Sequence, residues 1–546
     1  MKRYQKANEG IHAPEELKEK AARPSRKRPY AKWTGAVAAV LAIALIGGVA
    51  MRTGQTEPNV PDPGVPAPYT LEEPTPGPRA IPGENGEETP VFGTSYVGYT
   101  LAGAVYDSPE EELPPMPVWS DFHADNEDEE AWQQAEEAWD KAREEWRRIA
   151  YAAQYRVEES ETINGFVTAS TERFLAGAGE KNRVYSPLNV YMALAMLAET
   201  AGGESRQQIL DVLGVDSIET LREDAAALWE SYYQDDDLGI SVMANALWLR
   251  DGMDYSQDTL DTLAQTYRAS SFAGEMGSPE YDQAKRDWVN EQTRNMLTEQ
   301  ADGLFFDPET VLGLTSTLYF KSAWSGPFDP ERNTRDVFHA PSGDVEAEFM
   351  HTDEWNTGTY YWGDHFSAVC LGFQANHYGM WFLLPDEGYT VDDLLASGEA
   401  MEFLKIGHSY TYNRETDEIE YEWANRKYLR INLSLPKFDV SSDLELSAGL
   451  KALGITDIFD PGVSDFDPLG ASTGDPLCIS QVAHAARVTI DEEGCTAAAY
   501  TDLMLCGAGA PPDEEVDFTL DRPFLFAITG TGDLPMFLGA VNQPNG

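Results

Sequence analysis

Cysteine is scarce in this 546-residue chain. The four cysteines are Cys370, Cys478, Cys495 and Cys506, and none belongs to a C-x-x-C pair or stands beside a histidine-rich cluster. This low density disfavours a disulfide framework, and the missing pairs disfavour a zinc site. We therefore expect buried or half-exposed thiols, and neither a metal nor a cofactor.

Positive charge is also in short supply. There are 39 lysines and arginines against 93 aspartates and glutamates, which gives a formal net charge of -54. A nucleic-acid partner requires a basic surface and is therefore excluded. Anionic lipid headgroups would repel the chain in the same way. The acidity is typical of a well-solvated exterior, and it leaves the oligomeric state open.

Several catalytic motifs are missing too. The chain has no Walker loop, no G-x-G-x-x-G and no H-E-x-x-H. Pairs of carboxylates are expected by chance in a chain this acidic. His484 is the most isolated histidine in an apolar context, and we interpret it as a structural hydrogen-bonding residue. We expect the protein not to be an enzyme.

The first feature that is present is an uncharged apolar run at residues 34–51. As a helix it would be roughly 27 Å long, just enough for a bilayer core. The segment before it, 1–33, is basic, so the positive-inside rule predicts a cytoplasmic N-terminus and an extracellular C-terminal part. A cleaved signal peptide is the alternative, although such a peptide has a shorter basic head. The sequence thus predicts a single-pass protein of the cell membrane.

Two further segments separate this run from the C-terminal part. Residues 52–92 are rich in proline and read as an extended extracellular linker. Residues 93–158 form an acidic extension, whose start shows no clear period. Its later part carries Trp132, Trp139 and Trp146 at seven-residue spacing, which predicts a helix. That helix could form a short coiled coil between protomers, or pack its tryptophans on the following domain.

Residues 159–546 mix helical and strand patterns. Helices are predicted near 166–178, 191–199 and 205–213, and strands near 380–384 and 488–490. The two kinds of element do not alternate strictly. This arrangement favours an α+β fold over a doubly wound one.

An unusual loop lies near the C-terminus, where residues 491–512 read DEEGCTAAAYTDLMLCGAGAPP. About seventeen residues without structure are rare in a compact domain unless they are functional. Every second residue from Cys495 to Leu505 is uncharged, so the loop has the pattern of a strand with one buried face. A flexible surface loop rich in alanine and glycine is the alternative.

This loop resembles the hinge and reactive loop of the serpin family, and the resemblance extends over roughly residues 160 to 546. The motifs that carry it follow one another in the family's order: VYSPLNVYMALAMLAETAGGESRQQILDVLG (184–214), ANALWLRDG (244–252), LTSTLYFKSAWSGPFDP (314–330), LPKF (435–438), FTLDRPFLFAI (518–528) and FLGAVNQP (537–544). The resemblance implies a large, mostly antiparallel central sheet with surrounding helices and an exposed reactive loop. It also implies a suicide inhibitor of serine proteases, whose cleaved loop inserts into that sheet.

The resemblance assigns roles to particular residues. Lys437 and Glu492 resemble the pair at the entry point of insertion, and Trp324 the tryptophan beneath it. Ser186, Asn189, Ser316 and His484 resemble the hydrogen-bond cluster that lets the sheet open. The family usually has serine where Asn189 stands and asparagine where Ser316 stands, and a swapped amide and hydroxyl could restore the same bonds. The hinge comprises Gly494, Cys495, Thr496, Ala497, Ala498 and Ala499.

Counting about sixteen residues from Glu492, as is usual in the family, places the scissile bond at Ala508–Gly509. A small residue at 508 favours elastase-like or subtilisin-like targets, which would be held as a covalent acyl complex. Two alternatives remain: a non-inhibitory serpin acting as a surface binding protein, and an inhibitor of cysteine proteases.

Overall fold

The computed structural model describes residues 95–105, parts of 134–148, and 151–544 except 237, 353–355, 376–377, 408, 414–417, 471–476, 480–481, 496–511 and 513. Residues 74–546 form one compact unit, and the other unit, residues 1–73, lies outside the described residues. Most of the predicted tryptophan-bearing helix also lies outside them.

Serine side chains start most of the longer helices. The hydroxyls of Ser160, Ser186, Ser217, Ser256 and Ser278 each accept a hydrogen bond from the backbone N–H three residues further on. This contact satisfies an N–H group that the helix itself leaves unpaired. The predicted helices are present within α7, α8 and α9. The helices are α6 Ala152–Glu158, α7 Glu161–Leu175, α8 Pro187–Thr200, α9 Gly203–Leu213, α10 Ile218–Tyr232, α11 Gln257–Thr266, α12 Pro279–Gln292, α13 Thr298–Asp302, α14 Val391–Ala396, α15 Glu399–Ile406 and α16 Ser447–Leu453.

The predicted hinge begins in the sheet that contains β17. Its strand order is β1-β5-β4-β6-β17-β16-β15, with β3 also paired to β4. Only the β4–β5 pairing in this order is parallel, so the predicted mostly antiparallel sheet is confirmed. The strands are β1 Thr100–Ala102, β3 Gln234–Asp235, β4 Gly239–Arg250, β5 Ala269–Gly274, β6 Leu312–Ala323, β15 Phe438–Glu445, β16 Ala483–Ile490 and β17 Gly494–Cys495.

A second sheet packs at one end of the first, in the order β2-β20-β19-β11-β10-β9-β14-β8-β7, with β18 paired to β14. The C-terminal side of the candidate loop joins this sheet through β18, which runs parallel to β14. The strands are β2 Arg183–Tyr185, β7 Thr334–Ala340, β8 Gly343–His351, β9 Thr357–Trp362, β10 Phe366–Gly372, β11 Gly379–Pro385, β14 Arg426–Pro436, β18 Glu515–Thr519, β19 Phe524–Thr529 and β20 Pro535–Val541, and a separate hairpin has β12 Tyr410–Asn413 and β13 Glu418–Tyr421.

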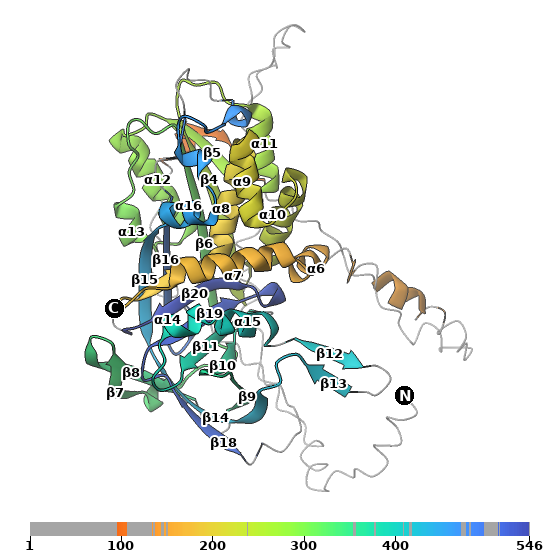
Figure 1. Ribbon diagram of the computed structural model, residues 1–546, viewed down its shortest axis with the longest axis vertical. Coiled ribbons are helices and arrows are strands. Elements are labelled where there is room, and N and C mark those ends of the chain that lie inside the picture. The colour runs from red at the N-terminus through yellow and green to blue at the C-terminus, as the bar shows by residue number, and fades with distance from the viewer. Residues whose placement is uncertain are drawn as a thin grey trace, which may run out of the picture. The chain divides into compact units, whose positions relative to one another are not determined.

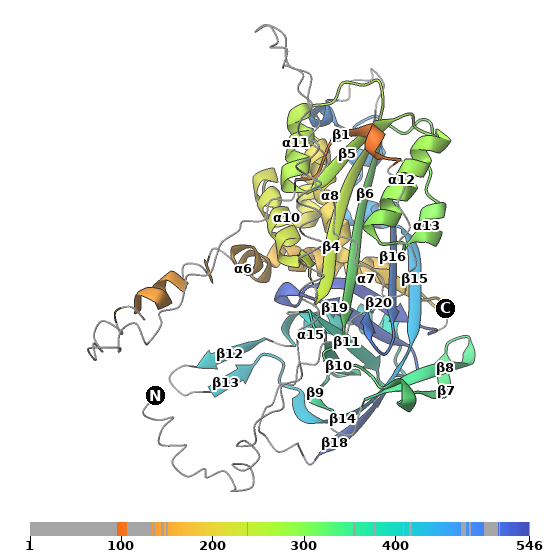
Figure 2. The same ribbon diagram turned by 180° about the vertical axis from the view of Figure 1, so that it is seen from behind.

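Helices cover both faces of the first sheet. α8 and α9 lie over one face (Figure 1), and α12 and α13 lie on the opposite side (Figure 2). Almost every residue of α8 is buried, since it packs between the sheet and its neighbouring helices. This mixed helical and sheet architecture confirms the predicted α+β class.

The extension before the main domain contains a short strand that the sequence did not predict. Residues 93–118 have no clear sequence period, yet the structure contains a 3-10 turn, η1 Val97–Tyr99, followed by β1. β1 is only three residues long, and it is ordered by pairing with β5 rather than by a pattern of its own. A periodicity search cannot find an element so short.

The predicted location in the cell membrane is wrong. Among the residues that the structure describes, no helix is both long enough and apolar enough to cross a membrane. Residues 34–51, on which the prediction rested, lie outside the described residues.

Candidate functional site

The predicted hinge begins inside the large sheet. After β16, a tight turn is held by Asp491, whose carboxylate accepts hydrogen bonds from the N–H groups of Glu493 (2.9 Å) and Gly494 (3.2 Å). The chain then reverses into β17, which lies between β16 and β6. Cys495 pairs with Ile490 on one side, and Gly494 and Cys495 pair with β6 on the other. The first two hinge residues therefore occupy a strand position at the end of the sheet.

Glycine is required at position 494 because the main chain of β6 comes very close. A Cβ atom there would lie 2.3 Å from the carbonyl oxygen of Ser322 and 2.7 Å from Cα of Ala323. Cys495 follows and is buried. The remaining hinge residues, 496–499, and the counted bond at 508–509 lie outside the described residues.

Trp324 closes the space beneath this turn, where the sequence predicted it. Its backbone N–H donates to the carbonyl of Glu493 (2.8 Å), and its indole N–H donates to the carbonyl of Asp491 (2.9 Å). Its ring is buried and stacks on Phe373 at 4.7 Å between centroids. Trp324 thus fixes the turn from which the loop departs.

The predicted Lys437–Glu492 pair is also formed. Lys437 Nζ lies 2.6 Å from Glu492 Oε1 and 2.9 Å from Glu348 Oε1. The side-chain amide of Asn333 donates to both carboxylates. Burial acts to raise the pKa of Glu492, but the hydrogen bonds from Lys437 and Asn333 outweigh it and hold that pKa below its usual value.

Sequence reasoning missed Glu348 and Asn333 at this entry point. Both are polar residues of the β7–β8 region, which has many exposed charges. Nothing in the sequence distinguishes these two from their neighbours, because their role arises only where β8 meets the end of β14.

The four residues of the predicted sheet-opening cluster come together as two bonded pairs. The N–H of Ser186 donates to Nε2 of His484 at 3.0 Å. The amide of Asn189 donates to the main-chain carbonyl of Ser316 at 3.0 Å, and the Ser316 hydroxyl bonds to the Asn189 side-chain oxygen. Ser186 and Asn189 lie at the start of α8, whereas the other two belong to β6 and β16. The cluster therefore joins a helix to both strands that flank β17.

The Ser316 hydroxyl has a second acceptor, which sequence reasoning missed. It lies 2.7 Å from Oδ1 of Asn245 on β4. A hydroxyl carries a single proton, so it cannot donate fully to both amide oxygens at once. A sequence signal for Asn245 was available, since it is a buried amide within the apolar stretch 242–249.

Burial keeps His484 uncharged. It lowers the pKa of this imidazole from 6.5 to about 4. A neutral ring can accept the Ser186 N–H at Nε2, whereas a protonated ring cannot. The interpretation of His484 as a hydrogen-bonding residue agrees with this geometry.

One stretch matches the nucleophile motif of hydrolases but lacks the structure that this motif requires. Residues 470–474 read GASTG, which matches G-x-S-x-G. A nucleophile elbow needs a strand before the serine and a helix after it. Here Gly470 ends a short 3-10 helix, Asp467–Leu469, and residues 471–476 lie outside the described residues. The preceding element therefore does not fit a hydrolase.

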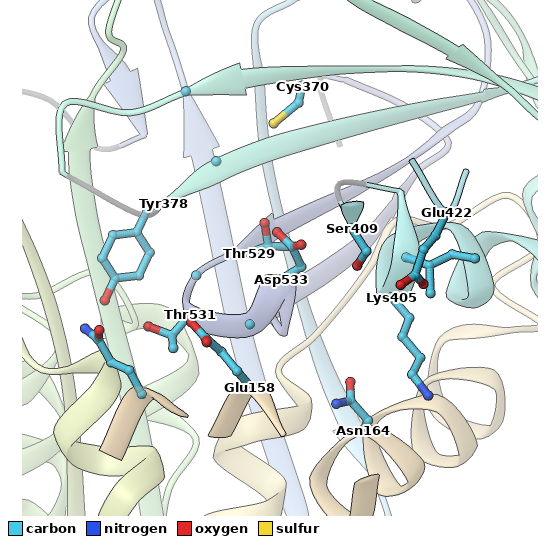
Figure 3. A pocket seen from close by; sticks show the side chains of 16 residues that line it. Glu158, Asn164, Cys370, Tyr378, Lys405, Ser409, Glu422, Thr529, Thr531 and Asp533 are labelled. Carbon is cyan, nitrogen blue, oxygen red and sulfur yellow. The ribbon is translucent and has the colours of Figure 1, made fainter. Parts of the chain in front are cut away.

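The described structure also contains a pocket of about 720 Å³. Figure 3 shows Lys405 and Glu422 on one side of it and Cys370 and Tyr378 on another. Its lining includes none of the predicted entry-point, hinge or cluster residues that are described.

Comparisons with known proteins identify the family. The family described as "Serpin (serine protease inhibitor)" matches residues 161–544. An uncharacterized serpin-like protein of Thermococcus kodakarensis is 28% identical over 71% of this chain and 87% of its own length. Putative serpin-Z12 of Oryza sativa subsp. japonica is 30% identical over 68% of this chain and 87% of its own length.

Solved structures give the same result. The thermophilic serpin tengpin in its native state is 25% identical, with a TM-score of 0.59 over 70% of this chain and 93% of tengpin. Arabidopsis AtSerpin1 in its native stressed conformation has the same fold, with a TM-score of 0.58 at 23% identity over 72% of this chain and 98% of that one. The family match covers well over half of the chain, the solved structures share its fold, and this protein therefore belongs to the serpin family.

Proposed function

We propose that this protein inhibits serine proteases as a suicide substrate, through cleavage and insertion of its reactive loop. The observation that carries the proposal is the position of β17, because Gly494 and Cys495 already pair with β6 and β16. Further loop residues can extend this strand by continuing the same ladder. Members of the family are generally protease inhibitors rather than enzymes, which supports the proposal.

The proposed chemistry is the first half of normal proteolysis. The serine oxygen of the protease attacks the carbonyl carbon of Ala508, and an ester bond forms between the two. The peptide bond to Gly509 breaks, and the histidine of the protease passes the proton to the departing amine. The cut loop then inserts between β6 and β16. About fourteen residues at roughly 3.3 Å each would carry the bound protease some 46 Å.

In this proposal the entry-point residues control how the strand grows. Lys437 holds Glu492 within the turn, and Trp324 bonds the main chain of the same turn. The alternating residues that would face inward, such as Cys495, Ala497 and Ala499, carry no charge. An uncharged face can be buried without the cost of desolvating an ion. A non-inhibitory serpin would not require this pattern.

The cluster at the start of α8 would control how the sheet separates. β6 and β16 must move apart to admit a full strand, and each is bonded to α8, through Ser316 and His484 respectively. Hydrogen bonds are short-ranged, so they resist separation only until the strands have moved a small distance. We assign Ser186, Asn189, Ser316 and His484 to this role.

The target class follows from the counted bond. Ala508 offers neither a cation nor an aromatic ring, so trypsin-like and chymotrypsin-like pockets would bind it poorly. We propose elastase-like or subtilisin-like proteases as targets.

The test is to mix the purified protein with a panel of elastase-like, subtilisin-like, trypsin-like and papain-like proteases. An SDS-stable adduct with the first two classes is expected, together with release of a C-terminal peptide that begins at Gly509. Cleavage without an adduct in every case would favour a non-inhibitory serpin. An adduct with papain-like enzymes alone would favour the cysteine-protease alternative.

A further inference from the structure

A short N-terminal segment, residues 95–105, lies outside the matched family region and is fastened to the large sheet. Its strand β1 pairs antiparallel with β5, at Thr100 with Phe272 and at Ala102 with Ser271. Beyond β1, the N–H of Ala104 donates to the hydroxyl of Ser270 (3.2 Å), and the N–H of Val105 donates to the carbonyl of Ala264 (3.1 Å). The segment thus joins β5 to α11, and Figure 2 shows β1 in orange beside β5.

Side chains of the same segment also contact α12. The ring of Tyr99 lies 5.0 Å from that of Tyr281, measured between centroids. The hydroxyl of Tyr96 donates to Glu291, and the hydroxyl of Ser95 donates to Asp287. These contacts run from the first turn of α12 to its last, so the whole helix is held.

α12 and the residues after it extend across the sheet. Trp288 of α12 packs edge-on against Trp248 of β4 at 6.1 Å. Further along, the guanidinium of Arg294 lies 5.5 Å from the ring of Tyr319 on β6. The contact with β16, on the other side of β17, is made by Arg487, whose guanidinium donates to the carbonyl of Met296 at 3.2 Å.

Residues 279–302 therefore bridge the two strands between which β17 lies. If β6 and β16 separate, the contacts on one side of this bridge must break or the bridge must move. If this bridge is held firmly against β4 and β5, it resists the separation of β6 from β16 more than a bridge that can shift. The reason is that its contacts with the sheet must break before an inserted strand can offer new ones.

We propose that residues 95–105 act as a clasp that slows the opening of the large sheet, and so keeps the loop from inserting before a protease has cut it. This regulatory role rests on the proposed inhibitory function. Kinetic stability of this kind comes from contacts that are lost on the way to the opened state.

The experiment uses the full chain with the double substitution Tyr96→Ala and Tyr99→Ala. It removes two of the three contacts with α12 and the ring contact of Tyr96 with Phe272 on β5, but keeps the backbone pairing of β1. Leu101→Ala is the matched control, since Leu101 lies on the same strand with 46% of its surface exposed. Each protein is incubated just below its unfolding temperature, and its remaining capacity to form a covalent protease complex is measured over time.

The double variant should lose this capacity at least about tenfold faster than the parent, as expected for the loss of two aromatic pairs and a charge-assisted hydrogen bond. The Leu101→Ala control should match the parent. Freshly prepared double variant should still form the complex, because the substitutions lie far from the hinge. Equal rates of loss in all three proteins would overturn the clasp.

A second measurement separates this proposal from the inhibitory function. If the parent forms no complex with any protease, the proposed function fails, and amide hydrogen exchange of residues 279–302 then tests the clasp alone. Faster exchange in the double variant supports the clasp, and unchanged exchange overturns it. If the double variant does not fold, Tyr96→Phe removes only the hydroxyl that bonds Glu291, and the same two outcomes apply.

Discussion

Replacing Gly494 by alanine should push the hinge out of the sheet. The added Cβ would lie 2.3 Å from the carbonyl oxygen of Ser322 and 2.7 Å from Cα of Ala323. Both are main-chain atoms of β6, so no side-chain rotation can relieve the contact. Either β6 moves away, which disturbs its ladder with β4, or β17 leaves its place between β6 and β16.

The size of the effect follows from the cost of overpacking. An extra methyl group in a tight site costs about 1–3 kcal/mol, which corresponds to a shift of about 5-fold to 150-fold in the balance between the inserted and the released hinge. The same clash is present in every state in which the loop is inserted, because the hinge keeps its register as the strand grows. Insertion should therefore slow relative to hydrolysis of the acyl bond.

The assay is the stoichiometry of inhibition, measured with an elastase-like or subtilisin-like protease that forms a complex with the parent. The Gly494→Ala variant should be consumed as a substrate, with a higher stoichiometry and a lower yield of SDS-stable complex. Gly326→Ala is the matched control, since a Cβ at that nearby position meets no atom within 4 Å. An unchanged stoichiometry in Gly494→Ala would refute the inference that the loop enters beside Ser322.

Three further predictions concern the scissile bond and the cluster. Ala508→Arg should shift inhibition towards trypsin-like enzymes, with a new N-terminus at Gly509 by mass spectrometry; a new terminus elsewhere would refute the bond assignment. Burial lowers the pKa of His484 from 6.5 to about 4, so the unfolded chain binds the proton more readily in this window. Stability should thus be complete above pH 6.5 and fall by about 3 kcal/mol as the pH drops to 4. Urea unfolding of His484→Gln should show a much smaller fall, and an equal fall would contradict this origin. Asn189→Ser and Ser316→Asn should each lower the free energy of unfolding by about 1–3 kcal/mol, and the double variant should recover much of the loss. Purely additive losses would show that the two side chains do not form an exchanged pair.

Much of the fold could be predicted because the signals are local or lie in long motifs. The helices that became α7, α8 and α9 have apolar periods, α7 and α8 also have serine caps, and the strand near 488–490 has simple alternation. A search along the chain detects patterns of this kind well. The hinge was placed by resemblance to the family, and its assignment to Gly494 and the small residues after it stays a prediction.

The entry point and the cluster were only partly accessible in this way. Lys437 and Glu492 were placed by resemblance, and the structure brings them within 2.6 Å of each other. Asn333 and Glu348 were missed, because each gains its role from a partner at least fifteen residues away. Hydrogen-bond partners at such separations are set by strand register and by how the sheets meet.

The sequence by itself determined the family and the α+β class, since these depend on residue types in a fixed order. The tertiary structure decided that the hinge starts between β6 and β16, that Asn189 and Ser316 bond directly, and that residues 95–105 add an edge strand to the sheet. It also overturned the predicted membrane location, for which the described residues contain no suitable helix. The physical reason is common to these cases: pairing across a sheet joins backbone groups that are distant in the chain, and a short strand such as β1 is stable only through its partner.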